Sequence, residues 1–431
     1  MNAQILSLRA LFVSVGAIQL ATAALGTLVA LQIASIGGTQ EAASIVAAAY
    51  SLGFMVGCFY IAKPLARIGH IRAFTAAAAI CTLFTLILSS TQEPVIMVFV
   101  RFITGLATAG LYAIGDAWIN DTAGPENRGR ILAVYAIVLG IVSVLSQGIV
   151  INQSAELSEA FVLVSMFYCF AIVVLATTRT NPASPGGTAN IRISEVFRES
   201  PTAFVGAFIN GLLVTVMLTV VPFRASVLGL DPRTIAIGIG LAYAGRIFFQ
   251  FPLGKASDEM DRRILIAGVS VFTAMILLLF VVLGKGDAAA AKGDYGIGWQ
   301  LFGFALVFLL GGLLLPTYSL LVAHGMDRTV PVYVPSAAVT LLFVWTLGGV
   351  TGPVLAAIVS KLFGDGNIFL MCLVIALTFS LFVVWRRNRR DSVPQAARAT
   401  HVPGTATSVE MTPEQKRVPV SATILGAEEE L

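Results

Sequence analysis

The sequence has little charge. Only 12% of its 431 residues are Asp, Glu, Lys or Arg, and 57% are hydrophobic. Soluble domains carry about 25% charged residues, and no soluble fold can bury this much apolar surface, whereas lipid can cover it. The composition therefore excludes a soluble globular protein and predicts an integral membrane protein.

Histidine and cysteine are also scarce. The three histidines (His70, His324 and His401) are scattered along the chain, and no paired carboxylates fall deep inside an apolar run. The four cysteines lie within apolar runs, without the spacing of a disulfide framework or a metal site. We therefore expect no catalytic residues, no metal, no cofactor and no enzyme activity.

Twelve long apolar runs dominate what is present. Each is long enough, or nearly so, to cross the hydrocarbon core as a helix of about 20 residues. None alternates every second residue, as the strands of a membrane barrel do. The sequence therefore predicts an all-α integral membrane protein with twelve transmembrane helices, at roughly 10–36, 42–62, 73–90, 95–117, 130–151, 159–177, 202–223, 234–254, 264–283, 300–323, 334–358 and 367–385.

The basic residues are distributed unequally between the two sides of the membrane. Up to residue 390, seventeen Lys and Arg residues lie in the segments on the side of the N-terminus, and five lie in the loops on the other side. Cytoplasmic loops carry the excess of Lys and Arg. This asymmetry predicts that both termini are cytoplasmic and that the protein lies in the cell (inner or plasma) membrane.

The loop 178–201 divides the chain. Its first part reads RTNPASPGGTAN (179–190), and its Pro and Gly residues favour a linker between two six-helix bundles, 1–177 and 202–387. It continues IRISEVFRES, which places Ile193, Val196 and Phe197 at helical spacing. This part is either a short helix on the membrane surface or an ordinary loop. Residues 388–431 are polar and are predicted to be a disordered cytoplasmic tail.

Two loops at the same position of each half carry the sequences IAKPLARIGHIR (61–72) and QFPLGKASDEMDRR (250–263). Both resemble the signature G-x-x-x-D-R-x-G-R-R of the major facilitator superfamily. The first loop departs from it at Ala62 and Ala66, and the second at Glu259 and Asp261. The positions that match are Arg67, Gly69, Gly254, Asp258, Arg262 and Arg263.

The resemblance implies a fold of two six-helix bundles and a role for these charges in gating. In the family this cluster holds the two halves together on the cytoplasmic side. Asp258 is then expected near residues 127–129, at the positive start of the fifth helix. The alternative is that the charges only anchor the topology. Arg101 and Gly105 resemble a second family motif, and the second loop together with PTYSLLVAHGMDR (316–328) resembles the YcaD-like branch of the superfamily.

Glycines recur at helical spacing in two of the runs. Gly53 and Gly57 lie in the second run, and Gly348, Gly352 and Pro353 lie in the eleventh. Small residues let helices approach closely, and proline interrupts the helical hydrogen bonds. We expect close helix packing at both places, with a kink in the eleventh helix.

The resemblance also implies a substrate site near the midplane of a central cavity. The first, fourth, seventh and tenth helices are expected to line this cavity, with contributions from the second, fifth, eighth and eleventh. For each uncharged candidate, a plain hydrogen bond between helices is the alternative. The polar residues deep inside these runs are Gln19, Tyr112, Gln147, Asn210, Tyr243, Arg246, Gln250, Tyr318 and Trp345.

Two arginines fall inside apolar runs, where a charge costs about 2.5–3.5 kcal/mol. Arg101 is about six residues from the end of its run, so we expect it to extend partly towards the membrane surface. Arg246 is about twelve residues into its run and cannot do so. It can meet an anionic substrate group, Asp116 across the interface between the halves, or backbone carbonyls.

These features predict a secondary transporter that moves a small molecule by alternating access. An organic anion is the favoured substrate, and Asp116, His324 and Asp327 are the candidates for proton coupling. The alternatives are an efflux permease for neutral or cationic compounds and a receptor built on a transporter fold. The expected partners are substrate, membrane lipid and a proton or other ion, with no nucleic acid. We expect a monomer.

Overall fold

The computed structural model describes residues 2–60, 69–151, 157–177, 191–284, 297–330 and 333–389, and within them all side chains except those of residues 2–8 and 119–130. Every regular element in these ranges is a helix. Twelve helical segments in the described chain are long and apolar enough to cross a membrane. The twelve spans predicted from the sequence are therefore confirmed.

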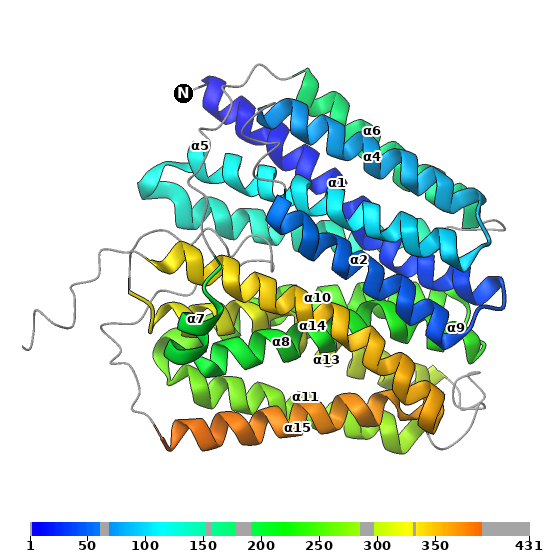
Figure 1. The fold of residues 1–431 in the computed structure, drawn as a ribbon, viewed down its shortest axis with the longest axis vertical. Helices are drawn as coiled ribbons and strands as arrows, with labels where there is room; N and C mark the ends of the chain where they lie inside the picture. The colour runs from blue at the N-terminus through cyan, green and yellow to red at the C-terminus, as the bar shows by residue number, and fades with distance from the viewer. Residues whose placement is uncertain are drawn as a thin grey trace, which may run out of the picture.

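The elements follow the predicted order (Figure 1). Those of the N-terminal half are α1 (Asn2–Ser35), α2 (Gln40–Tyr60), α4 (His70–Ser90), α5 (Pro94–Ile151) and α6 (Leu157–Ala176). The short α7 (Ile193–Glu199) precedes the C-terminal half. That half contains α8 (Pro201–Thr215), the π-helical turn η1 (Val216–Val220), α9 (Val221–Val227), α10 (Pro232–Glu259), α11 (Arg262–Gly284), α13 (Ile297–Met326), α14 (Val334–Phe363), the 3-10 turn η3 (Asp365–Asn367) and α15 (Ile368–Arg387).

One boundary differs from the prediction. The sequence indicates a loop between the fourth and fifth spans, but the helical backbone of α5 continues through it. The α5 ribbon, cyan in Figure 1, turns back on itself. Its two membrane-crossing parts, Pro94–Trp118 and Ile131–Ile151, are called the first and second arms of α5 below.

The two halves lie side by side, with the N-terminal half in blue to blue-green and the C-terminal half in green to orange (Figure 1). Helices α4 and α6 lie on the far side of the N-terminal half, and α11 and α15 lie on the far side of the C-terminal half. Helix α2 packs against α14, and α5 packs against α10. These contacts form the interface between the halves.

Glycines bring several helix pairs to backbone contact. A Cβ atom added at Gly53 would clash with the carbonyl of Phe102, and one at Gly348 would clash with the carbonyl of Phe208. Gly57 and Gly352 extend the same two contacts by one helical turn. The predicted close packing of the second and eleventh helices is therefore confirmed, since only a residue without a side chain fits there.

Residues Ile193–Glu199 form the helix α7, so the helical interpretation of this segment is correct and the loop interpretation is wrong. Val196 is buried, and the ring of Phe197 meets the ring of Phe204 edge-on at 5.3 Å. Val196 and Phe197, which the helical spacing places on one apolar face, pack on the start of α8. The linker residues 178–190 and the tail residues 390–431 lie outside the described ranges.

Candidate functional site

A cavity of about 240 Å³ lies between the two halves. Its wall is formed by α1, α2 and the first arm of α5 from one half, and by α8, η1, α10, α13 and α14 from the other. Seven of the nine predicted residues line it, namely Gln19, Tyr112, Asn210, Tyr243, Arg246, Tyr318 and Trp345. These seven come from six helices, which the fold brings to one place.

Gln147 and Gln250 do not line this cavity. The Gln147 side chain accepts a hydrogen bond from Thr27 at 3.0 Å and donates to Ser146 at 3.0 Å and to the carbonyl of Ala23 at 3.5 Å. The Gln147 amide therefore joins the second arm of α5 to α1. Gln250 is buried one helical turn beyond Arg246 on α10. For these two, the prediction of a place on the cavity wall is wrong.

The neutral amides of the cavity are engaged with other protein groups. Gln19 accepts a hydrogen bond from the Tyr112 hydroxyl and donates to Ser143 at 2.8 Å. Asn210 accepts from the indole N–H of Trp345 at 2.9 Å and donates to the carbonyl of Leu314 at 2.8 Å. These groups therefore shape the wall, and these hydrogen bonds use one N–H and one acceptor site of each amide.

Arg101 differs from the prediction. It is 4% exposed and lines the cavity, so it does not extend to the membrane surface. Its guanidinium carbon lies 4.1 Å from the centroid of the Tyr50 ring, a cation–π contact. Within the described chain, the Nε and Nη1 atoms of Arg101 have no hydrogen-bond partner. Arg101 is thus a cavity residue as well as part of a family-like motif.

The packing of α2 explains why Arg101 meets Tyr50. A Cβ atom at Gly105, one turn beyond Arg101, would clash with the carbonyl of Tyr50. Because Gly105 has no side chain, α2 approaches the first arm of α5 and places the Tyr50 ring under the guanidinium. The sequence shows both residues but offers no sign of the pairing, since they are far apart in the chain.

Arg246 reaches the same cavity from the other half. It is 7% exposed and lies on α10, one helical turn after Tyr243, which also lines the cavity. Among the described lining residues, none is Asp, Glu or His. Arginine stays protonated in proteins, so the wall carries two buried positive charges and no negative one. The cavity is therefore suited to an anion.

Small hydroxyl residues complete the wall and were not singled out from the sequence. Hydroxyls inside apolar runs commonly bond to their own helix backbone, as Thr219 does to the carbonyl of Thr215 at 2.6 Å. Such residues give no signal in the sequence that separates wall from core. The members of this group are Thr22, Ser51, Thr215, Thr219 and Thr346.

The family model of the Major Facilitator Superfamily matches residues 11–331 and 203–425. This chain belongs to that superfamily. An uncharacterized MFS-type transporter of Yersinia enterocolitica is 23% identical over 377 residues, which cover 87% of this chain and 94% of the relative. The uncharacterized MFS-type transporter YcaD of Salmonella arizonae is 24% identical over 367 residues, covering 85% and 92%. The predicted membership of the YcaD-like branch is confirmed.

Solved structures of superfamily members share the fold. A bacterial homologue of the human lysosomal transporter Spinster, in an inward-facing and occupied conformation, superposes with a TM-score of 0.73 at 12% identity, over 93% of this chain and 99% of that chain. The nucleoside transporter NupG gives a TM-score of 0.71 at 10% identity, over 89% and 99%. These likenesses confirm the predicted fold of two six-helix bundles.

The superfamily loop of the second half forms a buried charge cluster. Arg262 is 2% exposed, and its Nη1 donates to both carboxylate oxygens of Asp327 at 2.7 Å and to the carbonyl of Ala323 at 2.9 Å. Its Nη2 donates to Asp258 at 3.0 Å, and its Nε to the hydroxyl of Ser257 at 2.9 Å. Arg262 therefore ties the α10–α11 connection to the end of α13.

The other motif residues surround this cluster. Arg263 donates to Asp261 at 2.9 Å. Burial tends to raise the pKa of Asp261, but the hydrogen bonds from Arg263 outweigh it and leave this pKa below its usual value. Gly254 is buried in α10, and Gly69 precedes α4 with φ 81°, in the left-handed region that glycine favours.

Two parts of the gating hypothesis lie outside the described residues. Arg67 falls in 61–68, and the side chains near residues 127–129, where Asp258 is expected to make contact, belong to 119–130. The contact of Asp258 with the start of the fifth helix stays a prediction.

The candidates for proton coupling are separate from the described cavity wall. Asp116 is buried, and its Oδ1 accepts a hydrogen bond from the Tyr135 hydroxyl at 3.0 Å. Asp327 is bound to Arg262, and His324 is buried near it on α13. Asp116 lies one helical turn from Tyr112, so it is the candidate nearest the cavity along its helix.

Proposed function

We propose that this superfamily member is a secondary transporter for a small organic anion, which binds in the central cavity to Arg101 and Arg246. The observation that carries the proposal is the charge of the wall. Two buried arginines, one from each half, line one cavity whose described lining contains no carboxylate. A substrate carboxylate or phosphate would supply the missing negative charge.

Arg101 supports this most directly. Taking an arginine out of water is costly unless its donors and charge are matched. The Tyr50 ring stabilises the charge from one face, yet Nε and Nη1 have no hydrogen-bond partner in the described chain. Each of these N–H groups can donate a charge-assisted hydrogen bond to an oxygen of a carboxylate or phosphate.

The size of the cavity limits the substrate. Pockets for drug-sized ligands have volumes of about 300–1,000 Å³, and this cavity has about 240 Å³. A small metabolite therefore fits better than a large amphiphilic drug. Arg101 and Arg246 line the same cavity from opposite halves, so an anion bound by both would link occupancy to the rocking of the halves in alternating access.

Three finer points stay part of the proposal. The predicted orientation places both termini in the cytoplasm and the protein in the cell membrane. Proton coupling, with Asp116 as the first candidate, is a hypothesis. A pairing of Arg246 with Asp116 is the structural alternative to ligand contact by Arg246, and it leaves the role of Arg101 unchanged.

A thermal-shift screen of the purified protein tests the substrate class. The panel contains short mono- and dicarboxylates, sugar phosphates, neutral sugars, nucleosides, amino acids and lipophilic cations. A ligand that binds only the folded protein raises its melting temperature. We expect stabilisation by a member of the anionic group, followed by flux of that compound in proteoliposomes, which separates a transporter from a receptor.

Variants of the wall then localise the site. Arg101→Gln should weaken binding by about tenfold to a hundredfold, because hydrogen bonds to a charged group are worth about 1.5–3 kcal/mol. Arg246→Gln should weaken binding more than Arg246→Lys, which keeps the charge but loses the fork. Gly26→Leu should abolish binding, because Gly26 lines the cavity and a Cβ atom there meets nothing within 4 Å.

Gly148→Leu is the matched control. Gly148 lies on the second arm of α5 away from the cavity wall, and a Cβ atom there also meets nothing within 4 Å. It should bind and transport like the wild type. Stabilisation by neutral or cationic compounds alone, or wild-type affinity for the transported compound in Arg101→Gln, would overturn the anion proposal.

A further inference from the structure

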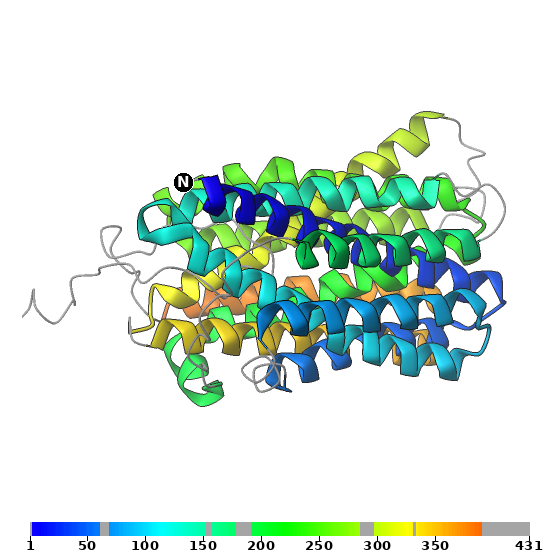
Figure 2. The same ribbon diagram turned by 90° about the horizontal axis from the view of Figure 1, so that it is seen from above.

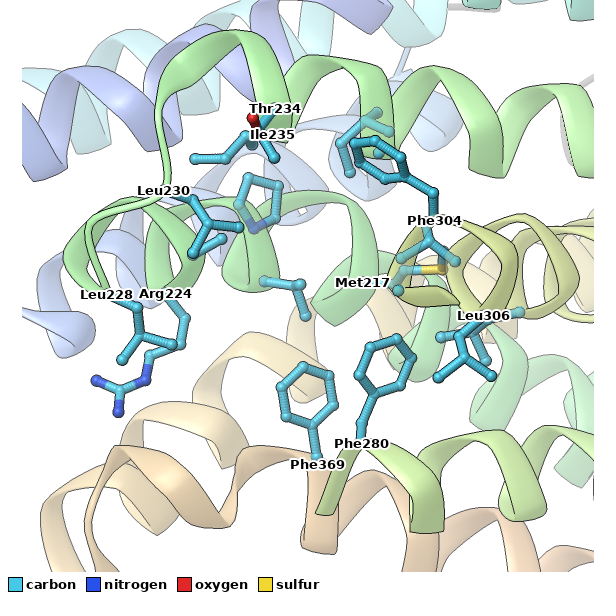
Figure 3. A pocket seen from close by; sticks show the side chains of 18 of the residues that line it. Met217, Arg224, Leu228, Leu230, Thr234, Ile235, Phe280, Phe304, Leu306 and Phe369 are labelled. Carbon is cyan, nitrogen blue, oxygen red and sulfur yellow. The ribbon is translucent and has the colours of Figure 1, made fainter. Parts of the chain in front are cut away.

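A second cavity, of about 590 Å³, lies within the C-terminal half (Figure 3). It is separate from the central cavity and is enclosed by α8, η1, α9, α10, α11, α13 and α15. Figure 3 shows Met217, Leu306, Phe280 and Phe369 around the open space. At this volume it lies in the range of about 300–1,000 Å³ that holds drug-sized ligands.

The wall of this cavity is apolar except at one end. The only charged residues in its described lining are Arg224 and Asp231, at the α9–α10 connection. Arg224 is bonded to Asp365 at 3.0 Å, and Asp231 accepts a hydrogen bond from the backbone N–H of Thr234 at 3.0 Å, which caps α10. The cavity therefore accepts an apolar body and leaves a polar group at one end.

Local irregularities of the helices keep this space open. The chain changes from α-helix to the π-helical turn η1 beside the cavity, and Pro222 is the second residue after this turn. Figure 2 shows the first turns of α13, in yellow-green, leaning away from the neighbouring helices. Gly238 and Gly303 also line the cavity, and a Cβ atom added at either meets nothing within 4 Å. The gap is thus built into the backbone.

The wall reaches the surface that faces lipid. Phe302 belongs to the lining and is nevertheless 42% exposed, and its neighbour Leu301 on α13 is exposed as well. Trp299, also in the lining, lies in the first turn of α13, on the same side of the membrane as the α9–α10 connection. Tryptophan is favoured where an apolar region meets the headgroup layer.

We propose that this cavity holds an acyl chain of a membrane lipid, which enters between α11 and α13 from the leaflet at the α9–α10 end. Lipid surrounds this face of a membrane-spanning bundle. An acyl chain is apolar and is attached to a polar headgroup, which matches a cavity that is apolar inside and polar at one end. The lipid braces α13 against α9 and α11. This inference is independent of the substrate proposed for the central cavity.

Photocrosslinking tests the proposal. The protein is reconstituted in phosphatidylcholine vesicles that contain a trace of phosphatidylcholine with a diazirine on one acyl chain, and labelled residues are mapped by mass spectrometry. We expect labels on buried lining residues, including Met217, Leu277 and Leu310. Labels confined to exposed surface residues such as Leu381 and Val282 would show annular lipid only and would overturn the proposal.

Two variants fill the cavity. Gly238→Leu and Gly303→Leu should each lower the labelling of the buried lining residues about tenfold, because excluding even two methylene groups weakens binding by about that factor. Gly268→Leu is the control, since Gly268 lies on α11 outside the lining and a Cβ atom there meets nothing within 4 Å. It should label like the wild type. Equal labelling of buried residues in all three variants would contradict the proposal.

Melting temperature in detergent gives a second readout that does not depend on labelling. Added phosphatidylcholine should raise the melting temperature of the wild type and of Gly268→Leu. It should raise that of the two filled variants much less, because leucine already occupies the space. A lipid effect of equal size in all four proteins would overturn the proposal even if the labelling pattern agreed with it.

Discussion

The two halves have the same arrangement of six helices, but they join corresponding helix pairs in different ways. In the N-terminal half, α1 and the second arm of α5 are linked by side-chain hydrogen bonds, from Gln19 to Ser143 and from Thr27 to Gln147. In the C-terminal half, α8 and α14 meet through their backbones, because Cβ atoms at Gly211 and Gly348 would clash with the facing carbonyls.

The difference shows how one fold tolerates divergent sequence. Polar side chains hold a helix pair at a distance that leaves room for other residues, whereas glycine contacts allow no side chain at all. The N-terminal pair is therefore adjustable and the C-terminal pair is not. The C-terminal half also contains the buried Arg262–Asp327 ion pair, so its stability depends on a few residues.

The largest effect is expected for Asp327→Asn. The variant leaves Arg262 buried without its closest counter-charge, and breaking a buried ion pair from one side costs about 3–5 kcal/mol. Thermal unfolding in detergent should show a large fall in the melting temperature. Asp258→Asn is the matched control, because Asp258 binds the same arginine but is 39% exposed and should cost about 1 kcal/mol or less. Equal losses in both variants would contradict this account.

A glycine-to-alanine substitution in each half tests the difference between the α1–α5 pair and the α8–α14 pair, because each adds one methyl group at the helix contact. Gly211→Ala should destabilise the protein by about 1–3 kcal/mol, because its Cβ atom meets the carbonyl of Trp345 and the backbones must separate. Gly16→Ala adds a methyl group in α1, where the nearest heavy atom, on Val142, is 3.9 Å away. It should be neutral or slightly stabilising, since alanine favours helix.

Both variants are measured by thermal unfolding in the same detergent. Because each replaces glycine by alanine within a helix, the change in helix propensity is the same and cancels in the comparison. A loss of stability in Gly16→Ala as large as that in Gly211→Ala would show that the two pairs are equally tight, and the proposed difference between the halves would be wrong.

The sequence predicts the fold well because long apolar runs, basic loops and glycine spacing are local patterns. It predicts the cavity wall less well. Depth within a run does not say which way a side chain faces, so the sequence predicts Gln147 on the wall, whereas its side chain bonds to α1. Distance from the end of the run likewise suggested that Arg101 extends outward, whereas the approach of α2 places Tyr50 over it.

The pairing of Arg101 with Tyr50 depends on Gly105, and no local pattern connects Tyr50 to the other two residues. The hydroxyl residues of the wall are also indistinguishable from those that bond to their own helix. The sequence gives no indication of the second cavity. This cavity lies beside a π-helical turn and the tilted start of α13, and neither feature produces a periodic pattern in the sequence.

The smallest effect is expected for the hydrogen bond between Thr27 and Gln147, and a double-mutant cycle of Thr27→Val and Gln147→Leu measures it. Hydrogen bonds between membrane helices are worth about 0.6 kcal/mol on average, because the separated helices also find partners. We expect a coupling energy of about that size, measured by unfolding in detergent. Thr27→Val with Thr378→Val is the control, since Thr378 bonds to its own helix in the other half, and the two should be additive. A coupling above about 2 kcal/mol would make the N-terminal pair as dependent on one contact as the C-terminal pair. That result would remove the difference between the halves, because a single side-chain bond would then be as necessary as a glycine.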